Sequence, residues 1–144
     1  MSRRVLIIDD DAAIREVLQV VLEEEGYEVI SAENGTVALE KLETMISDLI
    51  VVDLVMPHMN GYTFLNILQQ RTDRLSTLPT IVFTASTTTP QEVEQIEGAG
   101  YIYLAKPFEI DELLAKIKEL LSIPVTDSRY QQRHLPLTAP RKSA

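Results

Sequence analysis

The stretch Leu49-Ile50-Val51-Val52-Asp53 places four apolar residues directly before a carboxylate. Apolar and polar residues do not alternate in it, which is typical of a strand that is covered on both faces within a parallel sheet. Residues 5–8 and 81–83 have the same unbroken apolar character, and residues 27–30 and 101–104 supply two further short, largely apolar segments. Together these segments predict five strands.

Helical patterns separate the predicted strands. Apolar residues recur at helical spacing over residues 14–22 and 110–121, and more weakly over residues 37–45 and 64–68. The stretch Thr89-Pro90-Gln91-Glu92 combines an N-cap residue with Pro at the first helical position, which predicts the start of another helix. Regular alternation of strand and helix predicts an α/β fold, a doubly wound five-stranded parallel sheet in three α/β/α layers.

The end of the chain differs in character from the rest. Residues 124–144 contain Pro124, Pro136 and Pro140 and show no helical or strand period, so we expect a flexible tail or linker after one domain over residues 1–123. The 144 residues carry a net charge of −9. The tail has four basic residues and one acidic residue, a charge of +3, which leaves −12 on the domain.

Composition excludes several classes of protein. An acidic domain lacks the basic face that direct binding of nucleic acid needs, and it is unsuited to docking on an anionic membrane. No apolar stretch approaches the roughly 18 residues that span a bilayer. The chain has no Cys, which excludes disulfides, thiolate zinc sites and thiol catalysis. We therefore expect a cytoplasmic protein that contacts neither nucleic acid nor membrane directly.

Distinctive residues follow four of the predicted strands at their carboxyl ends, where open α/β sheets bind ligands. Asp9-Asp10-Asp11 follows the first strand, Asp53 the third and Thr84 the fourth, and Lys106 comes shortly after the fifth. If these strands are neighbours, as in the flavodoxin-like order 2-1-3-4-5, the side chains converge on one pocket. Asp11 has a simpler expected role, because Asp is a preferred N-cap for the helix that follows.

The predicted pocket suits phosphoryl chemistry. Clustered carboxylates repel one another, and a divalent cation removes the conflict. Mg²⁺ binds through one or two carboxylates, keeps several waters and accepts phosphate oxygens. Asp53 would then be a nucleophile that forms an aspartyl-phosphate. Lys106 would balance the charge of the transferred group, and Thr84 would hydrogen-bond its oxygen.

Four motifs make the chain resemble the receiver domain of response regulators, the phospho-accepting part of two-component signalling, over about residues 3–121. They are Ile8-Asp9-Asp10 with Arg15 behind it, residues 52–61 (VDLVMPHMNG), Phe83-Thr84-Ala85 and Lys106-Pro107-Phe108. The chain is similar to single-domain, chemotaxis-type response regulators. The resemblance implies the flavodoxin-like fold with strand order 2-1-3-4-5.

The resemblance also implies a role for each acidic residue. Asp53 matches the phospho-acceptor. Asp9 and Asp10 match the acidic pair at a Mg²⁺ or Mn²⁺ ion, with Asp10 as a direct ligand and Asp9 acting mainly through water. Asp53 and the backbone carbonyl of Val55 would complete the protein ligands, and no organic cofactor is expected.

A second set of residues would respond to the phosphoryl group. Thr84 matches the hydroxyl that moves onto it, and Lys106 matches its ion-pair partner, with a cis bond to Pro107. The aromatic switch residue of the family lies three positions before the lysine, which selects Tyr103. Because Tyr101 lies only two residues earlier and the segment after Thr84 is one residue shorter than usual, the spacing leaves Tyr101 open as an alternative.

The resemblance implies a signalling protein and not an enzyme, with slow self-dephosphorylation. The phosphoryl group would come from a sensor histidine kinase or a histidine phosphotransfer protein. Phosphorylation would change a protein-binding surface made by the fourth helix, fifth strand and fifth helix, which would bind a downstream protein. The sequence does not indicate which kinase, which target, the lifetime of the phosphoryl group, or whether the chain is a monomer.

Other interpretations remain open at this point. The chain could be the receiver fragment of a longer regulator whose output domain lies beyond it. A haloacid-dehalogenase-like phosphotransferase would use Asp9 as nucleophile, because Asp9-Asp10-Asp11 contains its Asp-x-Asp spacing, although Ala13 stands where such enzymes usually carry Thr. A flavin- or nucleotide-binding module would need Gly, Ser or Thr donors after the first strand instead of three acids. A degenerate receiver that binds no metal ranks lower.

Overall fold

A computed structural model of the chain describes residues 3–56, 59–85 and 89–122. It has five strands, five α-helices and one short 3₁₀ helix within these residues. The strands are β1 (Arg4–Ile8), β2 (Glu28–Ala32), β3 (Leu49–Asp53), β4 (Thr80–Ala85) and β5 (Ile102–Lys106). The helices are α1 (Ala12–Glu24), α2 (Gly35–Thr44), α3 (Gly61–Gln69), η1 (Arg74–Thr77), α4 (Pro90–Gly98) and α5 (Ile110–Leu121).

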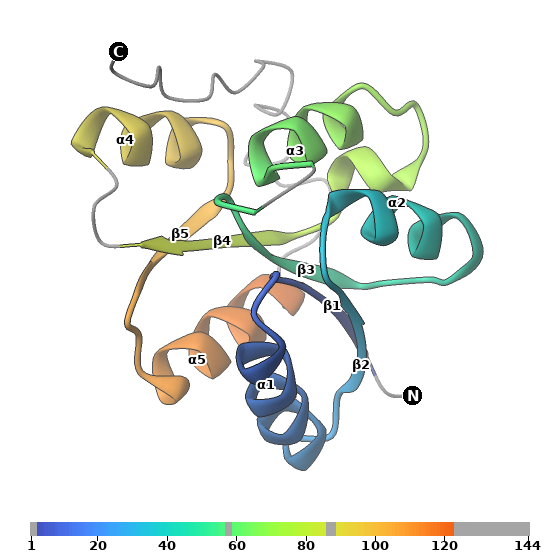
Figure 1. The fold of residues 1–144 in the computed structure, drawn as a ribbon, viewed down its shortest axis with the longest axis vertical. Coiled ribbons are helices and arrows are strands. Elements are labelled where there is room, and N and C mark those ends of the chain that lie inside the picture. Colours follow the sequence, from blue (N-terminus) through green and yellow to red (C-terminus); the bar gives the residue numbers. More distant parts are fainter. Residues whose placement is uncertain (1–2, 57–58, 86–88, 123–144) are drawn as a thin grey trace.

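The five strands form one parallel sheet in the order β2-β1-β3-β4-β5, which confirms the predicted fold (Figure 1). In the register of the central strands, Ile8 lies opposite Val52 on β3, and Asp53 lies opposite Phe83 on β4. One step further, Ala85 of β4 pairs with Lys106 of β5. The carboxyl ends of β1, β3, β4 and β5 therefore meet at one edge of the sheet.

Helices cover both faces of this sheet. Helices α1 and α5 lie on one face, and α2, α3 and α4 lie on the other (Figure 1). Two separate apolar cores result, one on each face. All five residues of β3 are buried, as its unbroken apolar sequence predicts for a central strand.

Local sequence explains where helix α1 begins and ends. The Asp11 carboxylate accepts hydrogen bonds from the backbone N–H groups of Ala13 and Ile14, so Asp11 is the N-cap, as expected. Beyond the last turn Gly26 adopts a φ of +94°, a left-handed conformation that Gly adopts without a Cβ penalty. Leu18 and Leu22 are buried against the sheet, whereas Val17, which belongs to the same sequence pattern, is 55% exposed.

Some boundaries differ from the predicted ones. Asp53, Thr84 and Lys106 were expected just after their strands and instead lie within them, because the backbone ladders continue to the carboxyl edge. Met45 was expected on the apolar face of the second helix but is its exposed C-cap residue. Helix η1 was not predicted, since four residues are too few to show a period. The predicted tail over residues 124–144 lies outside the described residues, so the domain boundary stays a prediction.

Candidate functional site

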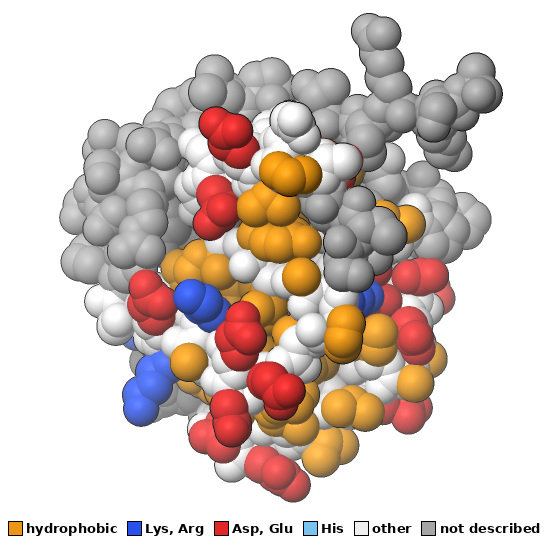
Figure 2. Space-filling model, turned by 90° about the vertical axis from the view of Figure 1, so that its left-hand side faces the viewer, with side chains coloured by type: hydrophobic (Ala, Val, Ile, Leu, Met, Phe, Trp, Pro, Cys, Tyr) orange, Lys and Arg blue, Asp and Glu red, His pale blue; other side chains and the backbone are white. Residues whose placement is uncertain are grey.

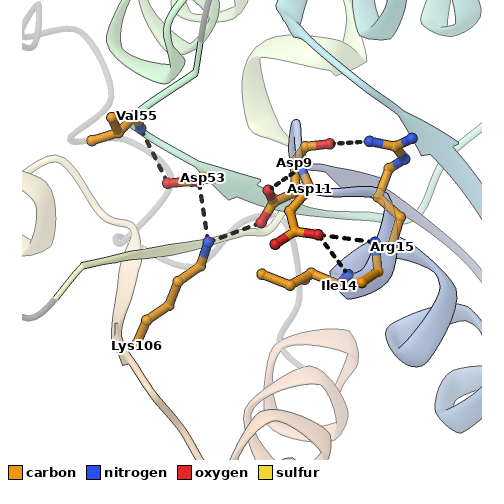
Figure 3. Close-up of polar contacts among 8 residues, drawn as sticks. Asp9, Asp11, Ile14, Arg15, Asp53, Val55 and Lys106 are labelled. Carbon is orange, nitrogen blue, oxygen red and sulfur yellow. Dashed lines mark hydrogen bonds and ion pairs between the residues drawn. The ribbon is translucent and has the colours of Figure 1, made fainter.

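Three strands deliver charged side chains to one point at the carboxyl edge of the sheet. Asp9 follows β1, Asp53 ends β3 and Lys106 ends β5. The Lys106 ammonium donates a hydrogen bond to Oδ2 of Asp9 at 2.9 Å and another to Oδ2 of Asp53 at 3.1 Å (Figure 3). Asp9 is fully buried and Asp53 is 5% exposed. Residues up to 97 positions apart in the chain thus form one buried ionic cluster.

The turn between β1 and α1 fixes the orientation of Asp9. The N–H of Asp11 donates to Oδ1 of Asp9 at 2.9 Å. The Arg15 guanidinium reaches back from α1 and donates to the backbone carbonyl of Asp9 at 2.7 Å (Figure 3). The Asp9 N–H continues the ladder to the carbonyl of Ala32. Hydrogen bonds therefore hold the backbone and both carboxylate oxygens of Asp9. The next residue, Asp10, is exposed.

The loop after β3 holds Asp53. The N–H of Val55 donates to Oδ1 of Asp53 at 3.1 Å, while Oδ2 faces Lys106. Val55 itself is 70% exposed, so a large apolar side chain stands next to the acceptor in solvent. The N–H of Gly61, the first residue of α3, donates to the carbonyl of Leu54 at 3.0 Å. The carboxylate is thus presented by a strand end that is tied to the following helix.

Aromatic rings set the position of the Lys106 side chain. Its Nζ lies 4.6 Å from the centroid of the Phe83 ring, a distance at which a cation is attracted to the face of an aromatic ring. Phe108 packs edge-on against Phe83, with ring centroids 5.7 Å apart. The Lys106–Pro107 peptide bond is cis, as the resemblance implied. Phe83 and Phe108 belong to the motifs noted in the sequence, but their supporting role was not predicted.

The charges in the site are unbalanced. Burial raises the pKa of Asp53 above its ordinary value, and the hydrogen bond from Val55 and the Lys106 ammonium offset this only in part. Burial alone would lower the pKa of Lys106, but the hydrogen bond to Asp9 and the charge of Asp53 outweigh it and raise that pKa. The two shifts have different causes, burial for Asp53 and the neighbouring carboxylates for Lys106. The site has a surplus of negative charge.

This surplus fits a divalent cation. Asp9, Asp10 and Asp53 each offer a carboxylate oxygen, and these oxygens lie within 4.8 Å of one another. Carboxylate oxygens are the hard ligands that Mg²⁺ and Mn²⁺ prefer. The described residues therefore contain a cluster able to hold a metal ion at the place predicted from the sequence. The predicted contribution of the Val55 carbonyl stays a prediction.

The predicted switch residues lie on β4 and β5. Thr84 is 2% exposed and pairs with Ala105, one step beyond the residue opposite Asp53. Tyr103 is half-buried and lines a groove of about 630 Å³ with residues of α4. Tyr101 is buried, and its hydroxyl accepts a hydrogen bond from the Gln69 amide of α3 at 2.9 Å. Of the two tyrosines, Tyr103 is the one at the α4 groove, which favours it for the predicted role.

An apolar groove of about 510 Å³ adjoins the ionic cluster, and it was not predicted. One wall is helix α1 and the other is the loop between β5 and α5. Its lining residues are Ala13, Ile14, Val17, Leu18, Lys106, Pro107, Phe108 and Ile110. Val17 is exposed in this groove, and its exposure could not be predicted because the apolar pattern of α1 does not distinguish exposed from buried residues. A partner surface placed in this groove would lie directly beside Lys106.

Comparison with known proteins identifies one family. The model of the response regulator receiver domain matches residues 5–118. The DNA-binding response regulator MtrA of Mycobacterium tuberculosis is 36% identical over 121 residues, which are 84% of this chain and 51% of that protein. The response regulator MprA of Mycobacterium ulcerans is 37% identical over the same share of this chain. The chain thus spans about half the length of the curated relatives that it matches.

Solved structures give the same result. A putative response regulator from Chloroflexus aurantiacus has a TM-score of 0.77 and 35% identity, covering 85% of this chain and all of that one. The response regulator TrrA from Thermotoga maritima, solved in complex with Mg²⁺ and BeF, has a TM-score of 0.70 and 33% identity over 82% of this chain and 98% of its own. Vibrio cholerae CheY4, a chemotaxis protein, has a TM-score of 0.75 and 28% identity over 83% of this chain and 99% of that one.

Proposed function

The chain belongs to the response regulator receiver domain family, and from this premise we propose that it accepts a phosphoryl group on Asp53. Receiver domains are signalling proteins, and this membership sets aside the dehalogenase-like and nucleotide-binding alternatives. One observation carries the proposal. Asp53 ends a central strand and accepts a hydrogen bond from Lys106, and one of its carboxylate oxygens lies within 4.8 Å of carboxylate oxygens of Asp9 and Asp10.

Three residues of the chain would take part in the transfer of the phosphoryl group. A carboxylate oxygen of Asp53 forms the new P–O bond while the P–N bond of a phosphohistidine breaks, and the histidine nitrogen keeps the electron pair. The Lys106 ammonium forms an ion pair with the phosphoryl oxygens, and the Thr84 hydroxyl donates a hydrogen bond to one of them. Mg²⁺ or Mn²⁺, held by Asp9, Asp10, Asp53 and the Val55 carbonyl, would neutralise charge on the transferred group.

The phosphodonor would be a sensor histidine kinase or a histidine phosphotransfer protein. The apolar groove between α1 and the β5–α5 loop supports this proposal, because it lies beside Lys106 and exposes Val17. A helical partner whose apolar face fills the groove would bring a phosphohistidine close to Asp53. Val55, which is apolar and exposed beside the acceptor, offers no polar group to an attacking water, so self-dephosphorylation would be slow.

The output would be a protein contact on the face of α4, β5 and α5. On this side of the molecule apolar side chains form a band among acidic ones (Figure 2). Phosphorylation would displace Thr84 and Tyr103 and so reshape the groove that Tyr103 shares with α4. We propose a downstream protein as the target of this surface and expect no nucleic-acid contact from residues 1–123.

The alternative of a longer regulator is compatible with the relatives. MtrA is named as a DNA-binding regulator, and the chain covers about half of it. An output domain of that kind would bind DNA itself while the receiver part stayed free of it. Within the part that the structure describes, no helix has the length and apolarity to cross a membrane. A cytoplasmic location remains our proposal.

Intact-mass measurement tests the proposed function. Incubation with Mg²⁺ and a small acyl-phosphate donor should add the mass of one phosphoryl group to the chain. Asp53→Asn should abolish the addition, whereas Asp48→Asn, a change to an acid at the opposite end of β3, should not. An Asp53→Asn chain that gains the same mass at the same rate would overturn the assignment. Chelation of Mg²⁺ should slow the addition in the unsubstituted chain.

A further inference from the structure

Helix α4 buries few of its side chains. Of its nine residues, Ile96 is the one that is fully buried. In the sequence α4 comes next after β4, the strand that carries Thr84, which is the residue predicted to move onto the phosphoryl group. Contacts that hold the first turn of α4 are therefore of interest for the response to phosphorylation.

A tyrosine of α3 makes one such contact. The Tyr62 hydroxyl donates a hydrogen bond to Oε2 of Glu92, in the first turn of α4, at 3.4 Å. The other carboxylate oxygen of Glu92, Oε1, accepts from the hydroxyl of the N-cap residue Thr89 at 3.1 Å. The Thr89 hydroxyl oxygen in turn accepts from the Glu92 N–H at 3.2 Å. Glu92 thus joins the cap of α4 to α3.

Burial keeps Tyr62 in its donating form. The side chain is 6% exposed. Burial, together with the nearby charge of Glu92, raises the pKa of Tyr62 to about 12, and Tyr103 contributes in the same direction. The hydroxyl is therefore protonated throughout the physiological range.

The other end of this connection is Asp53 itself. Tyr62 follows Gly61, whose N–H donates to the carbonyl of Leu54, the residue after Asp53. A Cβ at Gly61 would meet the Asp53 carbonyl oxygen at 2.6 Å, which shows how closely the two backbones approach. The first turn of α3 therefore contacts two places. Gly61 contacts the end of the strand that carries Asp53, and Tyr62 contacts Glu92 of α4.

We propose that Tyr62 and Glu92 are positioning residues that hold the first turn of α4 against α3 in the unphosphorylated chain. The inference rests on the proposed function, since it concerns the response to a phosphoryl group on Asp53. The hydrogen bond favours the resting position of α4, and displacement of α4 breaks it. Removal of the hydroxyl shifts the population toward the displaced state, which phosphorylation also favours.

Amide hydrogen exchange along α4 tests the contact. Tyr62→Phe, which keeps the ring, should raise exchange in the first turns of α4 about threefold to tenfold, the effect of one net hydrogen bond. Glu92→Ala also removes the acceptor of the Thr89 hydroxyl and should raise exchange at least as much, and adding Tyr62→Phe to Glu92→Ala should change little further. Glu92→Gln keeps one of the two oxygen acceptors and should raise exchange less than Glu92→Ala does, whereas the control Glu94→Gln, on the exposed side of α4, should resemble the unsubstituted chain. Unchanged exchange in Tyr62→Phe, or an equal rise in α5, would overturn the inference.

The rate of labelling by an acyl-phosphate donor supplies the second readout, because a purely structural contact would not change it. Tyr62→Phe should be labelled at Asp53 about threefold faster or more, since less work is needed to displace α4. If the unsubstituted chain is labelled and Tyr62→Phe is labelled at the same rate, this inference fails while the proposed function stands. If the unsubstituted chain is not labelled at all, the proposed function fails, and this inference fails with it.

Discussion

A Cβ atom at Gly61 would lie 2.6 Å from the backbone carbonyl oxygen of Asp53, closer than real Cβ contacts come. The same atom would lie 2.7 Å from Cα of Leu54. The close approach of the two backbones therefore explains why this position is a glycine. Backbone conformation does not explain it, because the φ of Gly61 is not in the left-handed region. The contact is between backbones, so it fixes the place of the carboxylate and the start of α3 together.

Gly61→Ala should therefore damage both stability and phosphorylation. The added methyl group has to displace backbone, so we expect a loss of about 1–3 kcal/mol, as in other overpacked sites. Urea unfolding measures this loss, and labelling by an acyl-phosphate donor should slow because Asp53 moves away from Lys106. Gly98→Ala is the matched control. Nothing lies within 4 Å of a Cβ there, and the helical position should gain a few tenths of a kcal/mol.

The meeting of Asp9, Asp53 and Lys106 could be predicted once the family resemblance implied the strand order, because it depends only on backbone topology. Parallel strands in the order 2-1-3-4-5 bring their carboxyl ends to one edge, whatever the helices do. The contact of Tyr62 with Glu92 did not follow, since it depends on how α3 and α4 pack and the two residues are 30 positions apart. Apolar periodicity identifies the buried face of a helix but not its neighbour.

The choice between Tyr101 and Tyr103 shows the same limit. Residues two apart in an extended segment point to the same side, so alternation cannot separate them. Their neighbours separate them. The Tyr101 hydroxyl is bonded to Gln69 of α3, whereas Tyr103 lines the groove beside α4. Val17 was likewise placed correctly on α1 but not recognised as exposed.

Removal of the Lys106 ammonium should destabilise the domain strongly. Lys106→Met leaves the carboxylates of Asp9 and Asp53 buried without their shared cation, a change that costs about 3 kcal/mol in comparable sites. The loss should shrink at low pH, where the carboxylates take up protons, and Mg²⁺ should restore part of it. Urea unfolding with and without Mg²⁺ measures both effects. Lys118→Met, on the exposed last turn of α5, should change stability by only a few tenths of a kcal/mol.

Neutralising Asp53 should stabilise the domain, in contrast to removal of the Lys106 ammonium. Burial raises the pKa of Asp53, so the folded chain binds this proton more tightly than the unfolded chain does. Stability is therefore lost as pH rises from the unfolded value, about 3.9, through the raised folded value. Asp53→Asn removes this loss while Lys106 keeps Asp9 as partner. Without divalent metal at pH 7 the variant should be more stable by about 1 kcal/mol.

The pH profile distinguishes this explanation from a general packing effect. Chemical unfolding of Asp53→Asn and the unsubstituted chain should give similar stabilities near pH 4, and the difference should grow with pH and then stay constant. Added Mg²⁺ should stabilise the unsubstituted chain more than the variant, because the variant has lost one of three clustered carboxylates. A variant that is less stable at pH 7 without metal would contradict the assignment of a charge surplus.

Arg15 should affect the metal site without touching it. Its guanidinium holds the backbone carbonyl of Asp9 at 2.7 Å and so fixes the turn that presents Asp9 and Asp10. Arg15→Ala should therefore weaken Mg²⁺ binding about tenfold, the usual effect of losing a group that orients a metal ligand. Titration calorimetry with Mg²⁺ alone measures this. Arg71→Ala is the control, because Arg71 pairs with Glu43 and Asp73 on the surface and should leave Mg²⁺ affinity unchanged. Equal affinities in the two variants would show that the turn keeps its shape without Arg15.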